Sequence, residues 1–282
     1  MEPRSAEADA EAAHAIERRF VLALGGFALE IAGATLVTHE HLPVPRFNYV
    51  EVHGVSRERQ SAFFERALDH YFQRALRPSF RVPIPVPVYL DAGLRRFGFR
   101  PRSTPRTTLT AGPAAEPPAT NGVRPRLARA SELDLVGSFW APERERPQLR
   151  AALAVAIAHP NPHESLAPML AFSGGEAVSA ALVFRHRSTA GIFAVATRPP
   201  SRGRGAASDL VGFVRSSEPA GPAERYALWA DSERLTARLS RLGFEPVGAE
   251  MEYELPPGAE LALPDPGPVT PPRWRPPRTR GP

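Results

Sequence analysis

Arginine and glycine alternate where an apolar strand is expected to pass into a helix. The apolar run Ile192–Ala196 predicts a strand, and residues from Ala206 to about Val214 carry apolar side chains at helical spacing. Between them lie Arg202, Gly203, Arg204 and Gly205. Glycines at such a junction let backbone N–H groups converge, and the N-terminus of the following helix adds partial positive charge. The sequence therefore predicts a socket for a diphosphate.

The composition narrows the chemistry available to the chain. It has no cysteine, which excludes disulfides, thiolate zinc sites and cysteine nucleophiles. Lysine is also absent, so all 35 basic residues are arginine, and neither a Schiff base nor a phosphate-loop lysine is available. His39 and His41 flank Glu40, but no third ligand is evident. A solvated strand end is expected there, and no metal site is predicted.

The basic residues give little reason to expect a nucleic acid as partner. The formal net charge is +5, but much of it comes from an acid-free stretch near the C-terminus that holds Arg273, Arg275, Arg278 and Arg280. Without these residues the chain is close to neutral, and no broad basic face is visible. A nucleic-acid-binding protein is therefore disfavoured.

Proline and apolar patterning divide the 282 residues into parts. Residues 111–122 are rich in Ala, Pro and Gly without apolar periodicity, which predicts a linker between two domains, residues 1–110 and 123–255. Residues 256–282 are dominated by Pro, Gly and Arg and are expected to be disordered.

One apolar run approaches the length needed to cross a membrane. It spans residues 20–37, but Gly25, Gly26 and Glu30 interrupt it, so a helix end followed by strands is predicted. Residues 1–11 are acidic and lack the profile of a signal peptide. A soluble cytoplasmic protein is expected.

The C-terminal domain shows a regular order of elements. Strands are predicted over 124–129, 166–172, 177–184, 190–196, 226–230 and 247–255, and helices are predicted to begin near residues 131, 147, 206 and 232. With the Arg-Gly-Arg-Gly turn in its place, this order resembles the GNAT superfamily of N-acyltransferases. The resemblance implies an α/β (α+β) fold, in which helices flank a mixed, mostly antiparallel sheet.

Two further segments carry the resemblance. Residues 238–244, Arg-Leu-Ser-Arg-Leu-Gly-Phe, resemble the family's helix that ends at an aliphatic-Gly-Phe before the last strand. Residues 228–232 lie where the family has a strand splayed from its neighbour, which admits the pantetheine arm of CoA.

The N-terminal domain repeats this ending in a fainter form. A helix over 57–76, a strand over 80–88 and a helix over 90–97 lead to Phe97-Gly98-Phe99. No glycine turn precedes the first of these helices. The domain therefore resembles a degenerate GNAT half that has lost its phosphate loop, as in tandem members of the superfamily.

The resemblance implies a binding site for acetyl-CoA. Backbone groups of Val195, Ala196 and Thr197 would pair with pantetheine. Backbone N–H groups of the turn would hold the pyrophosphate, namely those of Arg202, Gly203, Arg204, Gly205, Ala206 and Ala207. Pro200 stands where the family prefers Gln or Arg, and proline has no N–H to donate.

The usual catalytic groups of the family are absent. Members often place a Glu on the strand before the loop, but residues 189–197 contain no carboxylate, and Leu239 occupies the family's tyrosine position. Orientation alone supplies much of the rate in such reactions, so activity is compatible with these changes. No catalytic residue is assigned, and water, Asp231, Ser232 and Glu233 stay open as proton relays.

Two functions are compatible with these observations. The first is an N-acyltransferase that moves an acetyl group from acetyl-CoA to a primary amine of a small molecule or peptide, as a monomer or homodimer. The alternative is a catalytically silent GNAT-fold module that binds CoA or regulates a partner. The retained turn favours the enzyme, and the missing Glu and Tyr favour the silent module.

Overall fold

The computed structural model describes residues 5–114, 122–158, 161–256 and 258. Most of the predicted linker lies outside these ranges, as does the predicted disordered end apart from Pro256 and Gly258. Among the helices described, none combines the length and the apolar character that a membrane span requires.

The N-terminal part contains a long first helix, two shorter helices and six strands. The helices are α1 (Ala6–Ala23), α2 (Gln60–Phe72) and α3 (Val88–Arg96), and the strands are β1 (Phe27–Ile31), β2 (Ala34–Thr38), β3 (Tyr49–Val52), β4 (Ser79–Pro83), β5 (Arg100–Pro101) and β6 (Arg106–Ala111). Ser5 caps α1 by accepting a hydrogen bond from the N–H of Ala8 at 3.2 Å. The strand predicted over 80–88 is shorter, because Pro83, Pro85 and Pro87 cannot donate to a sheet.

The C-terminal part has the predicted order of elements. Its strands are β7 (Arg124–Leu127), β8 (Glu164–Ser173), β9 (Glu176–His186), β10 (Thr189–Thr197), β11 (Arg225–Ala230) and β12 (Glu245–Glu254), and its helices are α4 (Leu133–Gly137), α5 (Arg146–Ala158), α6 (Ala206–Ser217) and α7 (Glu233–Ser240). The mixed, mostly antiparallel sheet flanked by helices confirms the predicted fold class.

All the described strands belong to one sheet, and the two parts exchange strands within it. The order is β1-β2-β3-β4-β12-β6-β11-β10-β9-β8-β7, with β5 paired to β12. Thus β12, the last strand, lies between β4 and β6, and β6 lies between β12 and β11. The predicted boundary at residue 110 falls inside β6, since Ala111 still pairs with Tyr226. Each part therefore completes the other's sheet.

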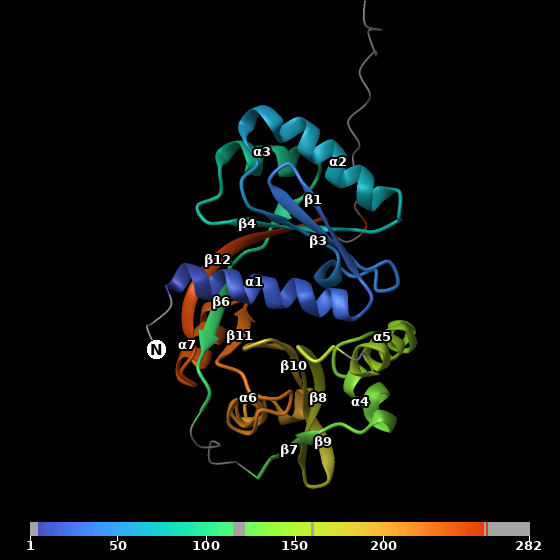
Figure 1. Ribbon diagram of the computed structural model, residues 1–282, viewed down its shortest axis with the longest axis vertical. Coiled ribbons are helices and arrows are strands. Elements are labelled where there is room, and N and C mark those ends of the chain that lie inside the picture. Colours follow the sequence, from blue (N-terminus) through green and yellow to red (C-terminus); the bar gives the residue numbers. More distant parts are fainter. Residues whose placement is uncertain (1–4, 115–121, 159–160, 257, 259–282) are drawn as a thin grey trace, which may run out of the picture.

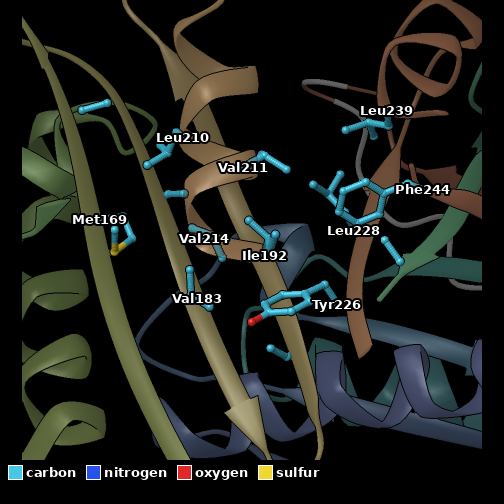
Figure 2. Close-up of a cluster of buried hydrophobic side chains, with 14 of the residues drawn as sticks. Met169, Val183, Ile192, Leu210, Val211, Val214, Tyr226, Leu228, Leu239 and Phe244 are labelled. Carbon is cyan, nitrogen blue, oxygen red and sulfur yellow. The ribbon is translucent and has the colours of Figure 1, made fainter. Parts of the chain in front are cut away.

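Three apolar cores hold the helices to this sheet. One packs α2 and α3 against β1–β4 and includes Tyr253 from β12. A second packs α1, α4 and α5 on β8–β10. The third holds α6 and α7 on the opposite face, where Leu210, Val211 and Val214 of α6 meet the strands (Figure 2). Figure 1 shows α1 crossing the middle of the molecule, between the N-terminal and C-terminal strands.

Candidate functional site

Strands β10 and β11 separate partway along their length. They pair in parallel only where residues 189–191 face residues 225–227. Beyond this point β10 has a bulge, with a register shift between Phe193 and Ala196 and a left-handed backbone at Ala194 (φ 52°). The splay expected beside residues 228–232 is therefore present.

The turn after β10 has the backbone of an anion socket. Gly203 and Gly205 have φ of 79° and 90°, values that favour glycine. Gly205 is the N-cap of α6 and has no side chain to cap the helix, so the first N–H groups of α6 have no side-chain cap. Arg202 and Arg204 are exposed beside them. Backbone donors, a helix N-terminus and two exposed cations thus occur together.

The predicted pantetheine contacts are in different environments. The carbonyl of Ala196 accepts a hydrogen bond from the Ser179 hydroxyl at 2.7 Å, and that of Thr197 accepts one from Arg202 Nε at 3.1 Å. Val195 borders the cavity at the splay, together with Ala207 from the first turn of α6. The other predicted turn residues lie outside the set that lines this cavity.

A cavity of about 670 Å³ passes through the splay. On one side of the sheet it is bordered by Ser208 and Val211 of α6 and by Leu239 of α7. On the other side it is bordered by α1, by Leu42 and by residues 44–47. Since these residues belong to cores on opposite faces, the cavity crosses the sheet, and both parts of the chain form its wall.

Aromatic rings form one side of the cavity. The ring of Phe193 stacks on Phe20 at a centroid distance of 4.2 Å and on Trp229 at 5.1 Å. The guanidinium of Arg106 lies 5.0 Å from the Trp229 ring centre. Trp229 Nε1 is buried and has no hydrogen-bond partner among the described residues. A buried indole N–H without a partner is a donor that a bound molecule can satisfy.

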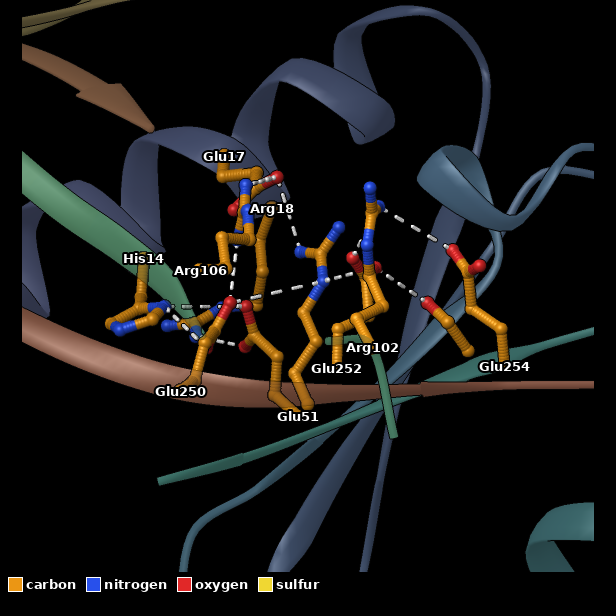
Figure 3. A network of polar contacts seen from close by, with 11 residues as sticks. His14, Glu17, Arg18, Glu51, Arg102, Arg106, Glu250, Glu252 and Glu254 are labelled. Atoms are coloured by element: carbon orange, nitrogen blue, oxygen red, sulfur yellow. Dashed lines mark hydrogen bonds and ion pairs between the residues drawn. The ribbon is translucent and has the colours of Figure 1, made fainter. Parts of the chain in front are cut away.

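A layer of charged side chains lies under α1, on the side of the cavity nearest the N-terminal part (Figure 3). Arg106 on β6 contacts both Glu17 of α1 and Glu250 of β12 at 2.6 Å. Arg81 on β4 is almost fully buried and lies 3.1 Å from Glu17. Arg18 pairs with Glu51 of β3. Ion pairs in this layer therefore join α1 to strands β3, β4, β6 and β12.

The environment shifts the pKa of several of these carboxyls. Burial alone would raise the pKa of Glu17, but Arg106 and Arg81 hold it below its ordinary value. Burial raises the pKa of Glu51, and Arg18 offsets this only in part. Burial and the neighbouring Glu252 raise the pKa of Glu254.

One cluster has the composition of a metal site. Ligand atoms of His14, Glu17 and Glu51 lie within 4.8 Å of one another. Arg18 and Arg81 already provide positive charge to these carboxylates, as Arg106 does to Glu17. The charge that a cation would supply is therefore already present, and the cluster is an ion-pair network.

The strand end that carries His39, Glu40 and His41 is solvated at Glu40 and His41, as expected, but not at His39. His39 is buried, and its Nε2 lies 3.0 Å from the carbonyl of Leu24. Glu40 instead accepts a hydrogen bond from Arg74 at 3.1 Å.

The candidate proton relays occupy different places. Asp231 borders the cavity and is exposed, directly after β11. The Ser232 hydroxyl accepts a hydrogen bond from the N–H of Leu235 at 3.4 Å, which caps α7. Glu233 is exposed and is not among the cavity-lining residues. Leu239 is buried against the core of α6 and offers no proton.

The carboxylates of β12 at this cavity were not among the site residues predicted from the sequence. Glu252 and Glu254 line it, and Arg102 lies between them and Asp231. A signal was available, because Glu250, Glu252 and Glu254 alternate along a predicted strand and must therefore share one face. Three carboxylates on one face of an internal strand indicate a buried polar site.

Solved structures share this architecture. A conserved protein of unknown function from Staphylococcus epidermidis aligns with a TM-score of 0.65 at 13% identity, over 82% of this chain and 95% of that one. A GNAT-type N-acetyltransferase from Kribbella flavida aligns with a TM-score of 0.60 at 16% identity, over 86% and 96%. An N-acetyltransferase-like protein of the same type from Streptococcus suis gives 0.50 at 13%, over 86% and 99%.

These comparisons establish the fold. The chain adopts the GNAT fold over most of its length, which confirms the resemblance seen in the sequence. No family model matches the sequence, and no curated protein matches it.

Proposed function

We propose that the protein is an N-acyltransferase that takes an acetyl group from acetyl-CoA and gives it to a primary amine. The observation that carries the proposal is a cavity that runs through a splayed pair of strands next to a glycine turn. The turn opens α6, whose residue Ala207 borders the cavity, β10 and β11 splay apart, and the cavity continues through the splay to the opposite face. Each feature serves a different part of the reaction.

The turn and the splay fit the two ends of the donor. The pyrophosphate would lie on the N–H groups from Arg202 to Ala207, where the helix dipole favours negative charge. The pantetheine arm would pass between β10 and β11 beside Val195, which places the acetyl group near Phe193 and Trp229. The unpartnered Trp229 N–H is a suitable donor for this end of the molecule.

The acceptor would enter from the side of α1. Its neutral amine attacks the thioester carbonyl, the C–S bond breaks, and the thiolate leaves with a proton from water. Most acceptor amines are protonated near pH 7, so a base must first remove a proton. Glu254 and Asp231 line the cavity and remain in part exposed, and the raised pKa of Glu254 makes it the better base.

A silent CoA-binding module is the second candidate function. It is favoured by the carboxylate-free strand β10 and by the buried Leu239, which stand where GNAT enzymes usually place catalytic groups. This candidate shares the donor site with the enzyme and differs only in the absence of acyl transfer.

Calorimetric titration with acetyl-CoA tests the donor site. Wild type is expected to bind, and Gly203→Asp with Gly205→Asp is expected to lose binding, because both positions need left-handed backbone and the new carboxylates repel phosphate. Gly174→Asp and Gly175→Asp, in the turn between β8 and β9 with φ of 59° and 87°, are matched controls. Failure of wild type to bind would overturn the assignment. Binding without thioester consumption across an amine panel would favour the silent module.

A further inference from the structure

Arg46 stands in the cavity wall, and none of the described residues forms an ion pair with it. It lies in the short 3-10 turn Pro45–Phe47, which borders the cavity from the N-terminal part. It makes no ion pair or hydrogen bond with another described residue. Glu252 and Glu145 are near enough to act on it electrostatically without pairing with it. The side chain is reached by solvent, yet surrounding protein lowers the pKa of its guanidinium, as expected for a cation that faces a cavity.

The turn that carries Arg46 is fixed by the buried side chain of Asn48. Its Nδ2 donates to the carbonyls of Leu42 at 2.7 Å and Val44 at 3.1 Å, and its Oδ1 accepts from the N–H of His39 at 2.9 Å. Asn48 is fully buried. The backbone that carries Arg46 is therefore fixed before any ligand arrives, which lowers the part of the entropy cost of binding that comes from ordering this turn.

Negative charge is in excess at the end of β12. Arg102 is shared by three carboxylates, at 3.3 Å from Glu252, 3.6 Å from Asp231 and 3.8 Å from Glu254. Arg81 lies 3.7 Å from Glu252 but also contacts Glu17. For Glu254, Arg102 is the one cation within ion-pair distance among the described residues. This end of the cavity therefore favours an added cation, and Arg46, which acts on Glu252 and Glu145 without pairing with either, can take an added anion.

We propose that the acceptor is a zwitterion, an amino acid or short peptide whose ammonium group lies at Asp231, Glu252 and Glu254 and whose carboxylate binds Arg46. This inference rests on the proposed function and names the substrate class of the same site. A simple amine would make no contact with Arg46, whereas a carboxylate would gain a charge-assisted hydrogen bond from its guanidinium. The apolar rings of Phe20 and Trp140, which also line the cavity, favour an acceptor with an apolar side chain.

Direct binding tests the subsite without any donor. Calorimetry on the unliganded protein would compare apolar α-amino acids and their dipeptides with the matching amides and with the amines that lack the carboxylate. Wild type is expected to bind the carboxylate-bearing compounds about tenfold or more tightly. Arg46→Gln is expected to remove this difference and leave the amines unaffected. Arg150→Gln is the matched control, since Arg150 pairs with the exposed Asp134 on α4, outside the cavity.

The outcomes separate this inference from the proposed function. Equal binding of amino acids, amides and amines by wild type would overturn the zwitterion subsite, and so would an Arg46→Gln variant that still prefers the carboxylate. If wild type does not bind acetyl-CoA, the proposed transferase function is overturned. The titration with amino acids needs no donor and can still be interpreted in that case. With acetyl-CoA present, the acetyl-transfer reaction can be followed by release of the CoA thiol. Wild type should then have a lower KM for amino acids than for the matching amides and amines. Arg46→Gln should raise KM about tenfold for the amino acids alone.

Discussion

Arg106 and Glu250 lie directly opposite each other on strands β6 and β12, and their side chains meet at 2.6 Å beneath α1. The second nitrogen of the same guanidinium donates to Glu17 of α1, also at 2.6 Å. One arginine thus joins the N-terminal helix, a strand of the N-terminal part and the last strand of the chain. These three elements form the wall between the two parts and border the cavity that crosses the sheet.

Replacing Arg106 should be costly. Arg106→Gln leaves the buried carboxylates of Glu17 and Glu250 with less compensation, and breaking a buried pair in this way costs about 3–5 kcal/mol. Urea unfolding followed by circular dichroism measures the loss. Arg150→Gln removes an exposed pair and should change stability by no more than about 0.5–1 kcal/mol. Equal effects of the two substitutions would contradict the structural role of Arg106.

The pH dependence of stability should show how much the ionised side chain of Glu17 contributes to it. Its folded-state pKa lies below the ordinary value of 4.5, so the unfolded chain takes up this proton at higher pH than the folded chain. The stability it contributes is present above pH 4.5 and is lost as pH falls through the lowered pKa. Glu17→Gln should therefore be most destabilising near pH 7, and the difference from wild type should narrow in acid.

Glu51 supplies the comparison of opposite sign. Its pKa is raised, so its contribution to stability is greatest when it is protonated and falls as pH rises from 4.5 through the raised value. As pH rises through this range, the free energy of unfolding of Glu51→Gln should increase relative to that of wild type. If the stability of both variants relative to wild type changes with pH in the same direction, the opposite pKa shifts of Glu17 and Glu51 are contradicted.

The exchange of strands predicts that neither part folds alone. A fragment ending at residue 114 lacks β12, which pairs with β4 and contributes Tyr253 to the core of α2 and α3. A fragment beginning at residue 122 lacks β6, whose Leu109 belongs to the core of α6. Each fragment should show no cooperative unfolding by circular dichroism, because unpaired strands and exposed core remain. Expressed together, the two should copurify as one folded complex, and a cooperative transition in either fragment alone would refute the shared sheet.

Most of the helices, strands and turns could be predicted from residues that are close together in the sequence. The Arg-Gly-Arg-Gly turn, the strands over 166–172 and 177–184 and the helix before Gly243 each depend on neighbouring residues, and the structure has these elements where they were predicted. The exchange of β6 and β12 depends on pairings more than one hundred residues apart in the chain, such as that of Arg106 with Glu250, and periodicity carries no information about them. The proposed role of Arg46 could not be predicted for the same reason, since it depends on residues such as Glu252 that the fold brings near it from distant parts of the chain.

Glu254 offers the sharpest test of catalysis. If it removes a proton from the acceptor, Glu254→Gln should lower kcat about 10²-fold or more while acetyl-CoA binding is unchanged. Glu233→Gln is the control. Glu233 is exposed two residues after Asp231 and is not among the cavity-lining residues. Asp231→Asn tests the neighbouring carboxylate, and a loss of kcat there with none at Glu254 would transfer the role to Asp231.

The pH profile distinguishes a proton acceptor from a residue that only shapes the site. Because burial and Glu252 raise the pKa of Glu254 above 4.5, wild-type kcat should fall as pH drops through that raised value, where the base becomes protonated. The Gln side chain of Glu254→Gln does not titrate. The fall of kcat at low pH that is due to Glu254 should therefore be absent from the pH profile of the variant's remaining activity. A wild-type limb that persists unchanged in Glu254→Gln would assign the proton transfer to another group. The raised pKa would then reflect only the burial of Glu254 and the neighbouring Glu252.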